Sequence, residues 1–222
     1  MTPCEIAALA RRPWVLVVLL LAPLVAVPAI DLAVSGWFHQ PGKGFPLRFL
    51  PLFEFVRKGL PAVLFGIVAY MLAMAAAGSV FGQRFLGIGW REAGFVSLSL
   101  ALGPGLVVNS LLKEHWGRAR PSQIVEFGGE ALFSPALAMS DQCASNCSFA
   151  SGHGALGFWV VAFALLAPPR WRPAAMVAAL LFGFAIGMVR VAQGGHFLSD
   201  VAFAGAITVG ITLLLHRMLY RP

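Results

Sequence analysis

Six long apolar runs constrain the fold of this sequence more than any other feature. They cover residues 14–34, 60–77, 93–112, 149–167, 173–191 and 200–215. A helix needs about 20 residues to cross the hydrocarbon core of a bilayer. Only 11% of the residues are charged, whereas a soluble domain carries roughly 25%. The pattern predicts an all-α, polytopic membrane protein whose six transmembrane helices form a single domain over residues 1–222.

The first apolar run has an alternative interpretation, because Arg11 and Arg12 precede it. A positively charged start followed by an apolar stretch is also typical of a cleavable signal peptide. The run is longer than the ~7–15 residues of a typical signal core. Its length favours a retained transmembrane helix.

The positive residues between the runs indicate how the helices are oriented. Six crossings place both termini on one side, where the positive residues are Arg11, Arg12, Arg84, Arg91, Arg170, Arg172, Arg217 and Arg221. The other side holds Lys43, Arg48, Arg57, Lys58, Lys113, Arg118, Arg120 and Arg190. Lys113, Arg120 and Arg190 belong to motifs described below and are explained by chemistry. The remaining positive charge is greater on the side of the termini, which predicts that this side is cytoplasmic.

Two cysteines lie close together on the opposite side. Cys143 and Cys147 are four residues apart, whereas Cys4 is near the N-terminus. In an oxidising compartment Cys143 and Cys147 can form a disulfide that closes a tight loop, and two free thiols are the alternative. A metal site is disfavoured, because neither a second cysteine pair nor a histidine cluster accompanies them.

Two connections on the same side as Cys143 are long enough to have a function. Residues 42–60 mix phenylalanines with charged side chains, which favours a segment lying in the membrane interface and lining the route of a lipid headgroup. A plain connecting loop is the alternative. Residues 114–148 form the longest polar stretch, and such loops are usually functional or disordered. We interpret it as a cap that selects the headgroup, with a solvated surface as the alternative.

The net charge of +7 does not indicate nucleic-acid binding. The positive residues are scattered over short connections and form neither a basic stripe nor a known reader motif. In a membrane protein such residues set the orientation and contact anionic headgroups or a phosphorylated substrate. The expected partners are the bilayer and a phosphorylated membrane lipid, without an obligate protein partner.

Three short motifs carry side chains suited to phosphoryl transfer. They are Lys113 with Arg120-Pro121, then Ser151-Gly152-His153, then Arg190 with His196 and Asp200. Lysine and arginine hold phosphate oxygens, and histidine can attack phosphorus or transfer a proton. Each motif lies at an end of an apolar run on the same predicted side. The topology therefore predicts that the three motifs form one site, at a depth where charged residues are usually functional.

These motifs resemble the signature of the type 2 phosphatidic acid phosphatase superfamily, which also includes vanadate-dependent haloperoxidases. The signature reads Lys-x6-Arg-Pro, then Pro-Ser-Gly-His, then Ser-Arg-x5-His-x3-Asp. The first motif matches completely, whereas Ala150 replaces the proline of the second and Val189 the serine of the third. The missing serine removes a possible hydrogen bond near the phosphate.

The resemblance implies hydrolysis without a metal or cofactor, through a phosphohistidine. His196 would attack phosphorus, and Asp200 would fix the tautomer that leaves one ring nitrogen free. His153 would protonate the leaving oxygen and then activate water. The residues that would hold the phosphate oxygens are Lys113, Arg120, Ser151, Gly152 (through its backbone amide) and Arg190.

Each of these residues has a structural alternative when it is taken singly. His153 resembles an ordinary buried histidine, Arg190 an arginine reaching the interface from a helix end, and Asp200 a helix N-cap. The joint pattern favours the functional interpretation. Three further histidines match no motif and receive no role: His39, His115 and His216.

The expected activity is that of a lipid phosphatase at the outer face of a bacterial cytoplasmic (inner) membrane, hydrolysing a phosphomonoester or pyrophosphate. Residues 115–121 and 146–153 resemble bacterial lipid A phosphatases more specifically. Undecaprenyl pyrophosphate and phosphatidylglycerophosphate are alternative substrates, because the motifs contact only phosphate.

A non-catalytic phospholipid-binding or transport protein is an alternative from a different functional class. Haem ligation by His153 and His196 is disfavoured, as is a haloperoxidase, which is expected to be soluble.

Overall fold

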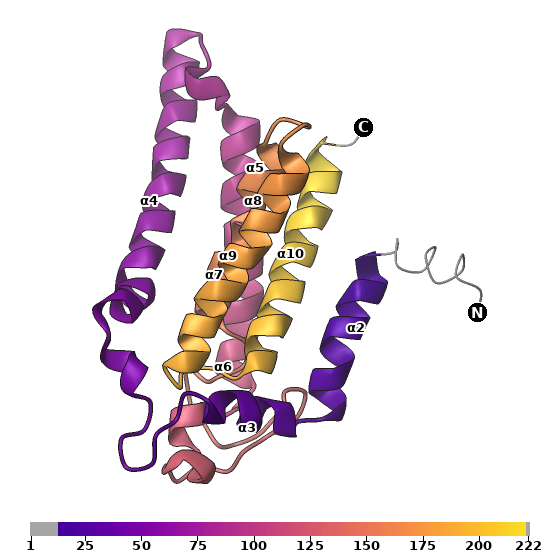
Figure 1. Ribbon diagram of the computed structural model, residues 1–222. Coiled ribbons are helices and arrows are strands. Elements are labelled where there is room, and N and C mark those ends of the chain that lie inside the picture. The colour runs from indigo at the N-terminus through magenta and orange to yellow at the C-terminus, as the bar shows by residue number, and fades with distance from the viewer. Residues whose placement is uncertain (1–12, 221–222) are drawn as a thin grey trace, which may run out of the picture.

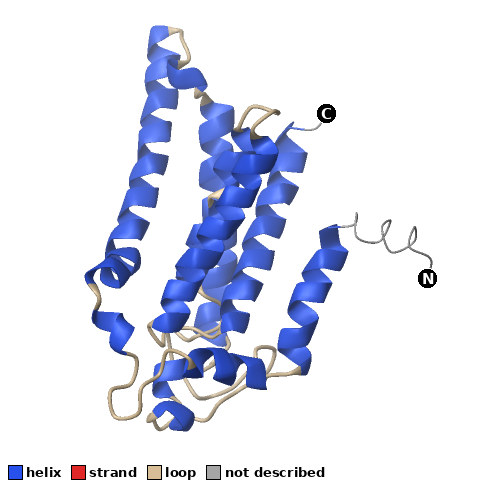
Figure 2. Cartoon of the chain, in the orientation of Figure 1, coloured by secondary structure: helices blue, strands red, loops and turns tan. Residues whose placement is uncertain are grey.

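The computed structural model describes residues 13–220, which are helical with connecting loops and contain no β-strand (Figures 1 and 2). The longer helices are α2 (Pro13–Ala26), α3 (Ala29–Gly36), α4 (Pro51–Phe81), α5 (Trp90–Leu100), α7 (Gly152–Trp159), α8 (Val161–Leu166), α9 (Arg172–Ala192) and α10 (Leu198–Tyr220). Shorter or non-α elements are η1 (Pro46–Phe49), η2 (Phe85–Gly87), the π-helical η3 (Ala101–Leu112), α6 (Lys113–His115), η4 (Pro121–Gln123) and η5 (Val125–Phe127). The all-helical prediction is confirmed.

Four helical segments are long and apolar enough to cross a membrane. They are α4, the continuous stretch Trp90–His115, α9 and α10. The pair α2 and α3 would make a fifth span if it is counted as one, and α7 with α8 forms a shorter apolar helix, Gly152–Leu166. Residues 13–220 therefore contain four candidate spans or up to five, so the prediction of six is met only in part.

From the sequence we expected the first apolar run to form one transmembrane helix, but in the structure it is bent. The axis turns by 86° between α2 and α3, and α3 lies across one end of the bundle (Figure 1). Pro28 explains the break, because it lacks a backbone N–H and disfavours helical geometry at Val27. Four residues used in the sequence analysis lie outside the described residues: Cys4, Arg11, Arg12 and Arg221.

The predicted interfacial segment 42–60 is also partly helical. Its second half forms the first turns of α4, which begins at Pro51. Proline suits this position because its missing N–H would have no helical partner there. The helix ends at Gly82, whose φ of +66° is the left-handed geometry of a helix C-terminus. Only residues 42–50 form a connection, which includes η1.

The centre of the bundle is formed by α7, α9 and α10, which approach closely at glycines. A Cβ atom on Gly157 would lie 3.0 Å from the Cα atom of Gly183. A Cβ atom on Gly187 would lie only 2.1 Å from Cγ1 of Val201. Small residues allow such approach between membrane helices, whereas α2 and α4 flank this centre from opposite sides (Figure 1).

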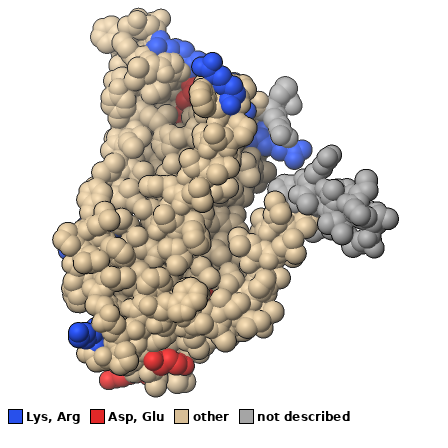
Figure 3. Space-filling view, viewed as in Figure 1, with Lys and Arg blue, Asp and Glu red and all other residues tan. Residues whose placement is uncertain are grey.

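The surface has the polarity expected of a membrane protein. Large apolar side chains are exposed along the outer helices, for example Leu19, Phe65 and Leu181. On the face shown in Figure 3 most of the charged side chains lie toward the two ends, and the middle carries few of them. The connections that carry the three motifs lie at the end that α3 covers, the lower end in Figure 1.

Candidate active site

The three motifs are joined at this end by backbone hydrogen bonds. The N–H of Ser151 donates to the carbonyl oxygen of Asp200 at 3.1 Å, which links the second motif to the third. The N–H of Cys147 donates to the carbonyl oxygen of Lys113 at 3.1 Å, which links the first motif to the segment before the second. Ser151 also caps α7, because its Oγ accepts the N–H of Gly154 at 3.2 Å. The motifs therefore form one connected unit.

His196 lies between α9 and α10 and is only 1% exposed. Its Nδ1 lies 2.7 Å from the carbonyl oxygen of Ser148. A carbonyl oxygen only accepts hydrogen bonds, so in the neutral ring Nδ1 carries the proton and Nε2 keeps its lone pair. This Nε2 is buried and has no hydrogen-bond partner among the described residues. The ring thus presents an unprotonated, unpartnered nitrogen.

Asp200 is close to His196 but is not its nearest partner. Its Oδ2 lies 3.8 Å from Nδ1 of His196, beyond hydrogen-bond distance. The same oxygen accepts the hydroxyl of Ser148 at 2.6 Å and the N–H of Phe197 at 2.8 Å. Asp200 therefore acts on the imidazole through Ser148, and its contact with Phe197 organises the first turn of α10.

Arg118 holds the other oxygen of Asp200, although from the sequence it is only a positive residue in a connection. Its Nη1 donates to Oδ1 of Asp200 at 2.6 Å, and its Nε donates to the carbonyl oxygen of Ser134 at 2.8 Å. The guanidinium also lies over the ring of Phe197, 4.3 Å from the centroid. Arg118 is fully buried, and its place inside the first motif was the signal that it belongs to the site.

Asp31 of α3 is a second residue that sequence reasoning missed. Its Oδ2 accepts Nη2 of Arg118 at 2.8 Å, and its Oδ1 accepts the N–H of Ser199 at 2.9 Å. Asp31 is 1% exposed. A lone carboxylate inside an apolar run is itself an indication of function. The pair Asp31–Arg118 attaches α3 to the base of the site.

Four arginines line a cavity of about 500 Å3 beside these residues: Arg48, Arg57, Arg120 and Arg190. No acidic side chain lines it. The Nη2 of Arg120 donates to the carbonyl oxygen of Asn146 at 2.6 Å, and Nη1 of Arg190 donates to Oε1 of Gln193. The Nε of Arg190 is buried and has no hydrogen-bond partner within residues 13–220. Such a concentration of guanidinium groups favours a phosphate.

The remaining predicted residues do not line this cavity. Lys113, His153 and His196 are absent from its wall, although Gly195, next to His196, belongs to it. The Nε2 of His153 lies 2.8 Å from the carbonyl oxygen of Arg57, so α4 holds this imidazole. Gly152 lies against Asn109, and a Cβ atom there would come within 2.5 Å of Oδ1 of Asn109.

The electrostatic environment keeps His196 neutral. Burial lowers the pKa of His196 to about 3, Arg190 and Arg120 act in the same direction, and Asp200 opposes them. Burial also lowers the pKa of Arg120, with Arg48 acting in the same direction and Asp200 opposing. A neutral imidazole beside several cations is suited to attack an anionic phosphate ester.

Cys143 and Cys147 form a disulfide in the structure. The loop that it closes contains Asn146, the partner of Arg120, and leads into Ser148, the partner of His196. No group of three or more His, Cys, Asp or Glu side chains that could hold a metal ion occurs within residues 13–220. The disulfide loop therefore holds backbone carbonyls against two site residues.

Comparison with known proteins identifies the family. A model of the PAP2 superfamily matches residues 94–222, which include all three motifs. A lipid A 4′-phosphatase of Francisella tularensis subsp. novicida (strain U112) is 37% identical over 201 residues, which cover 87% of this chain and 88% of the relative. A lipid A 4′-phosphatase of Rhizobium leguminosarum is 32% identical over 197 residues, 82% of this chain and 84% of the relative.

A shorter similarity extends to a second kind of relative. A lipid A 1-phosphatase of Rhizobium etli (strain ATCC 51251) is 40% identical over 117 residues, which cover 52% of this chain and 45% of the relative. No solved structure matches the chain significantly. The family match and the identity over most of both chains show that this chain belongs to the PAP2 superfamily, the type 2 phosphatidic acid phosphatases that its motifs resemble.

Proposed function

We propose that this protein is a phosphoric monoester hydrolase that removes a phosphate from a lipid A-type membrane lipid. The relatives that cover most of the chain are named lipid A 4′-phosphatases. The observation that carries the proposal is the state of His196, whose buried Nε2 is unprotonated and unpartnered. A cavity lined by Arg48, Arg57, Arg120 and Arg190 adjoins it. This arrangement provides a nucleophile next to a phosphate site.

In the proposed first step, the lone pair on Nε2 of His196 attacks phosphorus. A bond forms between nitrogen and phosphorus while the bond from phosphorus to the lipid oxygen breaks. The proton stays on Nδ1, which donates its hydrogen bond to the carbonyl oxygen of Ser148, and this bond stabilises the ring as it becomes positive. Asp200 supports this charge from 3.8 Å and keeps Ser148 in place.

His153 is proposed as the acid in this step and the base in the next. With both ring nitrogens protonated at the start of the step, it gives its Nε2 proton to the departing lipid oxygen and becomes neutral. It then takes a proton from the water that attacks the phosphohistidine, which releases phosphate and restores both histidines to their starting states. In the structure its Nε2 contacts the carbonyl oxygen of Arg57 at 2.8 Å. When substrate binds, the Nε2–H of His153 must therefore give up its hydrogen bond to the carbonyl oxygen of Arg57 and donate to the leaving oxygen instead.

The negative charge of the transferring phosphoryl group is proposed to lie among several donors. Arg120 and Arg190 contribute from the cavity wall, and the Nε of Arg190 has no other partner. Lys113, the hydroxyl of Ser151 and the backbone N–H of Gly152 complete the set. The N–H of Gly152 lies at the N-terminus of α7, where the helix favours an anion.

The proposed location is the inner membrane of a bacterium, with six crossings and the site at the periplasmic face. The excess of positive residues at the opposite end supports this orientation, and so does the disulfide between Cys143 and Cys147 beside the site. A membrane-impermeant thiol reagent is expected to label these cysteines in spheroplasts only after reduction. Labelling only after lysis would contradict this location, whereas labelling without reduction would contradict the disulfide that supports it.

The activity is tested by release of inorganic phosphate from lipid A, undecaprenyl pyrophosphate and phosphatidylglycerophosphate in detergent micelles. We expect the fastest release from lipid A and none above background from His196→Ala. Release from another lipid alone would identify a different substrate within the same class. Tight binding of lipid A without any release would support a binding protein and contradict the proposed activity.

A further inference from the structure

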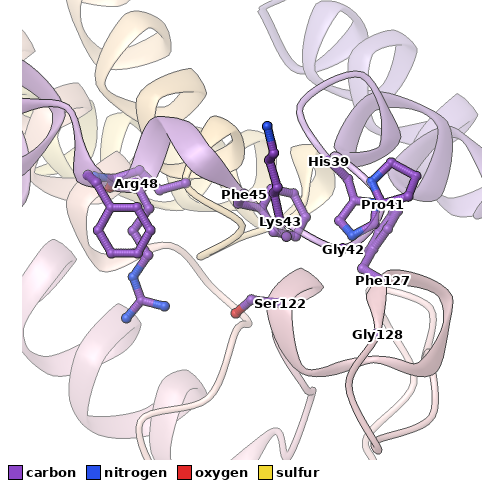
Figure 4. A pocket seen from close by; sticks show the side chains of 12 residues that line it. His39, Pro41, Gly42, Lys43, Phe45, Arg48, Ser122, Phe127 and Gly128 are labelled. Atoms are coloured by element: carbon purple, nitrogen blue, oxygen red, sulfur yellow. The ribbon is translucent and has the colours of Figure 1, made fainter.

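Figure 4 shows a second cavity, of about 580 Å3. It adjoins the cavity lined by Arg48, Arg57, Arg120 and Arg190, which we call the arginine cavity. It lies between residues 39–49 on one side and the loop that carries Ser122, Phe127 and Gly128 on the other. The two cavities share the lining residues Arg48, Ser122 and Gln193. A molecule held in the arginine cavity can therefore extend directly into the second one.

The charges of the second cavity favour an anion. Lys43 and Arg48 line it, and none of its lining residues is acidic. Within the described residues, neither Lys43 nor Arg48 forms an ion pair, and both side chains are exposed. Both cations are therefore available to a ligand.

Gln193 provides an independent indication at the boundary of the two cavities. It is only 2% exposed, and its Oε1 accepts a hydrogen bond from Arg190. Its Nε2 has no hydrogen-bond partner among the described residues. A buried donor without a partner has an energetic cost, because it has given up its hydrogen bonds to water and gained none in return. An acceptor oxygen from a ligand at this boundary would remove that cost.

The opposite wall is aromatic and already ordered. The rings of His39, Phe45 and Phe127 contact one another, with centroids 5.0–5.5 Å apart. Binding sites for small molecules typically combine such an apolar wall with a few polar groups that fix orientation. This combination fits a headgroup that has a carbon ring and an anionic substituent, and it gives a place to His39, which matched no motif.

We propose that this second cavity binds a further phosphate of the lipid whose first phosphate is cleaved in the arginine cavity. The inference rests on the proposed function. The relatives are named as phosphatases of the 4′ and the 1 position of lipid A, so such a lipid offers phosphates at two positions. Lys43, Arg48 and the amide of Gln193 hold the phosphate that is not cleaved. The preferred substrate is therefore a lipid with two phosphates on its headgroup.

The test compares Lys43→Gln with wild type on lipid A that carries two phosphates and on lipid A that carries one. We expect KM for the two-phosphate lipid to rise roughly three- to tenfold, and KM for the one-phosphate lipid to stay within twofold. Lys58→Gln is the matched control. This substitution also removes one positive charge, but Lys58 lies on α4 and lines neither cavity. It is expected to change neither KM value.

An equal effect of Lys43→Gln on both lipids, or no effect on either, would overturn the proposal. Inorganic phosphate is a second probe, which as a product inhibits from the arginine cavity. Lys43→Gln could weaken this inhibition and leave both KM values unchanged. The second cavity would then bind free phosphate and not the second phosphate of the lipid, and the proposal would be wrong. If wild type hydrolyses neither lipid, the proposed function fails. Binding of the two lipids to wild type and Lys43→Gln, measured directly, then decides the subsite by the same comparison.

Discussion

Arg118 and Asp200 form a fully buried ion pair, with 2.6 Å between Nη1 and Oδ1, although 82 residues separate them in the sequence. Through the hydroxyl of Ser148, Asp200 is connected to the backbone that orients His196. Asp31 holds the same guanidinium from α3. His196 is thus positioned by contacts that reach three distant parts of the chain, at Asp31, Arg118 and Ser148.

Replacing Arg118 by methionine is expected to destabilise the protein strongly. Removing one partner of a buried ion pair costs about 3–5 kcal/mol, because the remaining charge is left without compensation. The control is Arg84→Met, which removes an arginine that is 60% exposed from its pair with Glu92 and should cost less than about 1 kcal/mol. Thermal unfolding in detergent measures both, and equal losses would contradict the buried role of Arg118.

Ser148→Ala and Asp200→Asn separate the two supports of His196. Ser148→Ala keeps the carbonyl oxygen that accepts Nδ1–H, so we expect kcat to fall by less than roughly tenfold. Asp200→Asn removes the negative charge that is proposed to stabilise the ring as it becomes positive on phosphorylation, and it leaves Arg118 without its partner charge, so kcat should fall by about 100-fold or more. A larger loss in Ser148→Ala than in Asp200→Asn would show that the hydroxyl of Ser148, and not its carbonyl, orients the ring.

Gly187→Ala tests the close approach of α9 and α10. The new Cβ atom would lie 2.1 Å from Cγ1 of Val201, so the helices must separate, at a cost of about 1–3 kcal/mol. Gly210→Ala on α10 is the matched control, because no atom lies within 4 Å of a Cβ there. It should leave stability unchanged or raise it by about 0.5–1 kcal/mol. Equal unfolding temperatures for the two variants would refute the tight packing.

The buried, neutral state of His196 predicts how stability depends on pH. Its pKa is about 3 in the folded protein and about 6.5 in an unfolded chain. Between these values the unfolded state binds more protons, so stability falls as the pH decreases below about 6.5. From pH 7 to 5 the loss is on the order of 1–2 kcal/mol.

The variant His196→Asn provides the comparison, because its amide can still donate to Ser148 but cannot titrate. Unfolding temperatures at pH 7 and pH 5 should therefore differ less for His196→Asn than for wild type. If both proteins lose the same stability, His196 does not account for the pH dependence.

The sequence predicted the elements of the site better than their connections. Hydropathy located the helices, because a bilayer imposes length and apolarity on each span, but it could not reveal the bend at Pro28 or the helical start of α4 at Pro51. The topology predicted that the three motifs meet at one end of the bundle, where backbone hydrogen bonds join them, but Lys113 does not line the cavity that Arg120 and Arg190 line. The roles of these residues and of the two histidines stay predictions.

The parts of the site that the sequence did not predict are contacts that residue types alone do not encode. The nearest partner of His196 is the backbone carbonyl of Ser148, and every residue has such a group. The pairing of Arg118 with Asp31 joins positions 87 apart, so only the folded chain shows that the two charges meet. A lone charge in an apolar run was the one signal that could have pointed to Asp31, and the sequence reasoning did not use it.

The central claim is that Nε2 of His196 becomes covalently phosphorylated during turnover. Wild-type protein is mixed with lipid A carrying radioactive phosphate, denatured within milliseconds in alkali and digested. We expect the label on the peptide that contains His196, stable in alkali and lost in acid, and no label in His196→Ala. Undiminished phosphate release by His196→Ala, or label on another residue, would contradict the account.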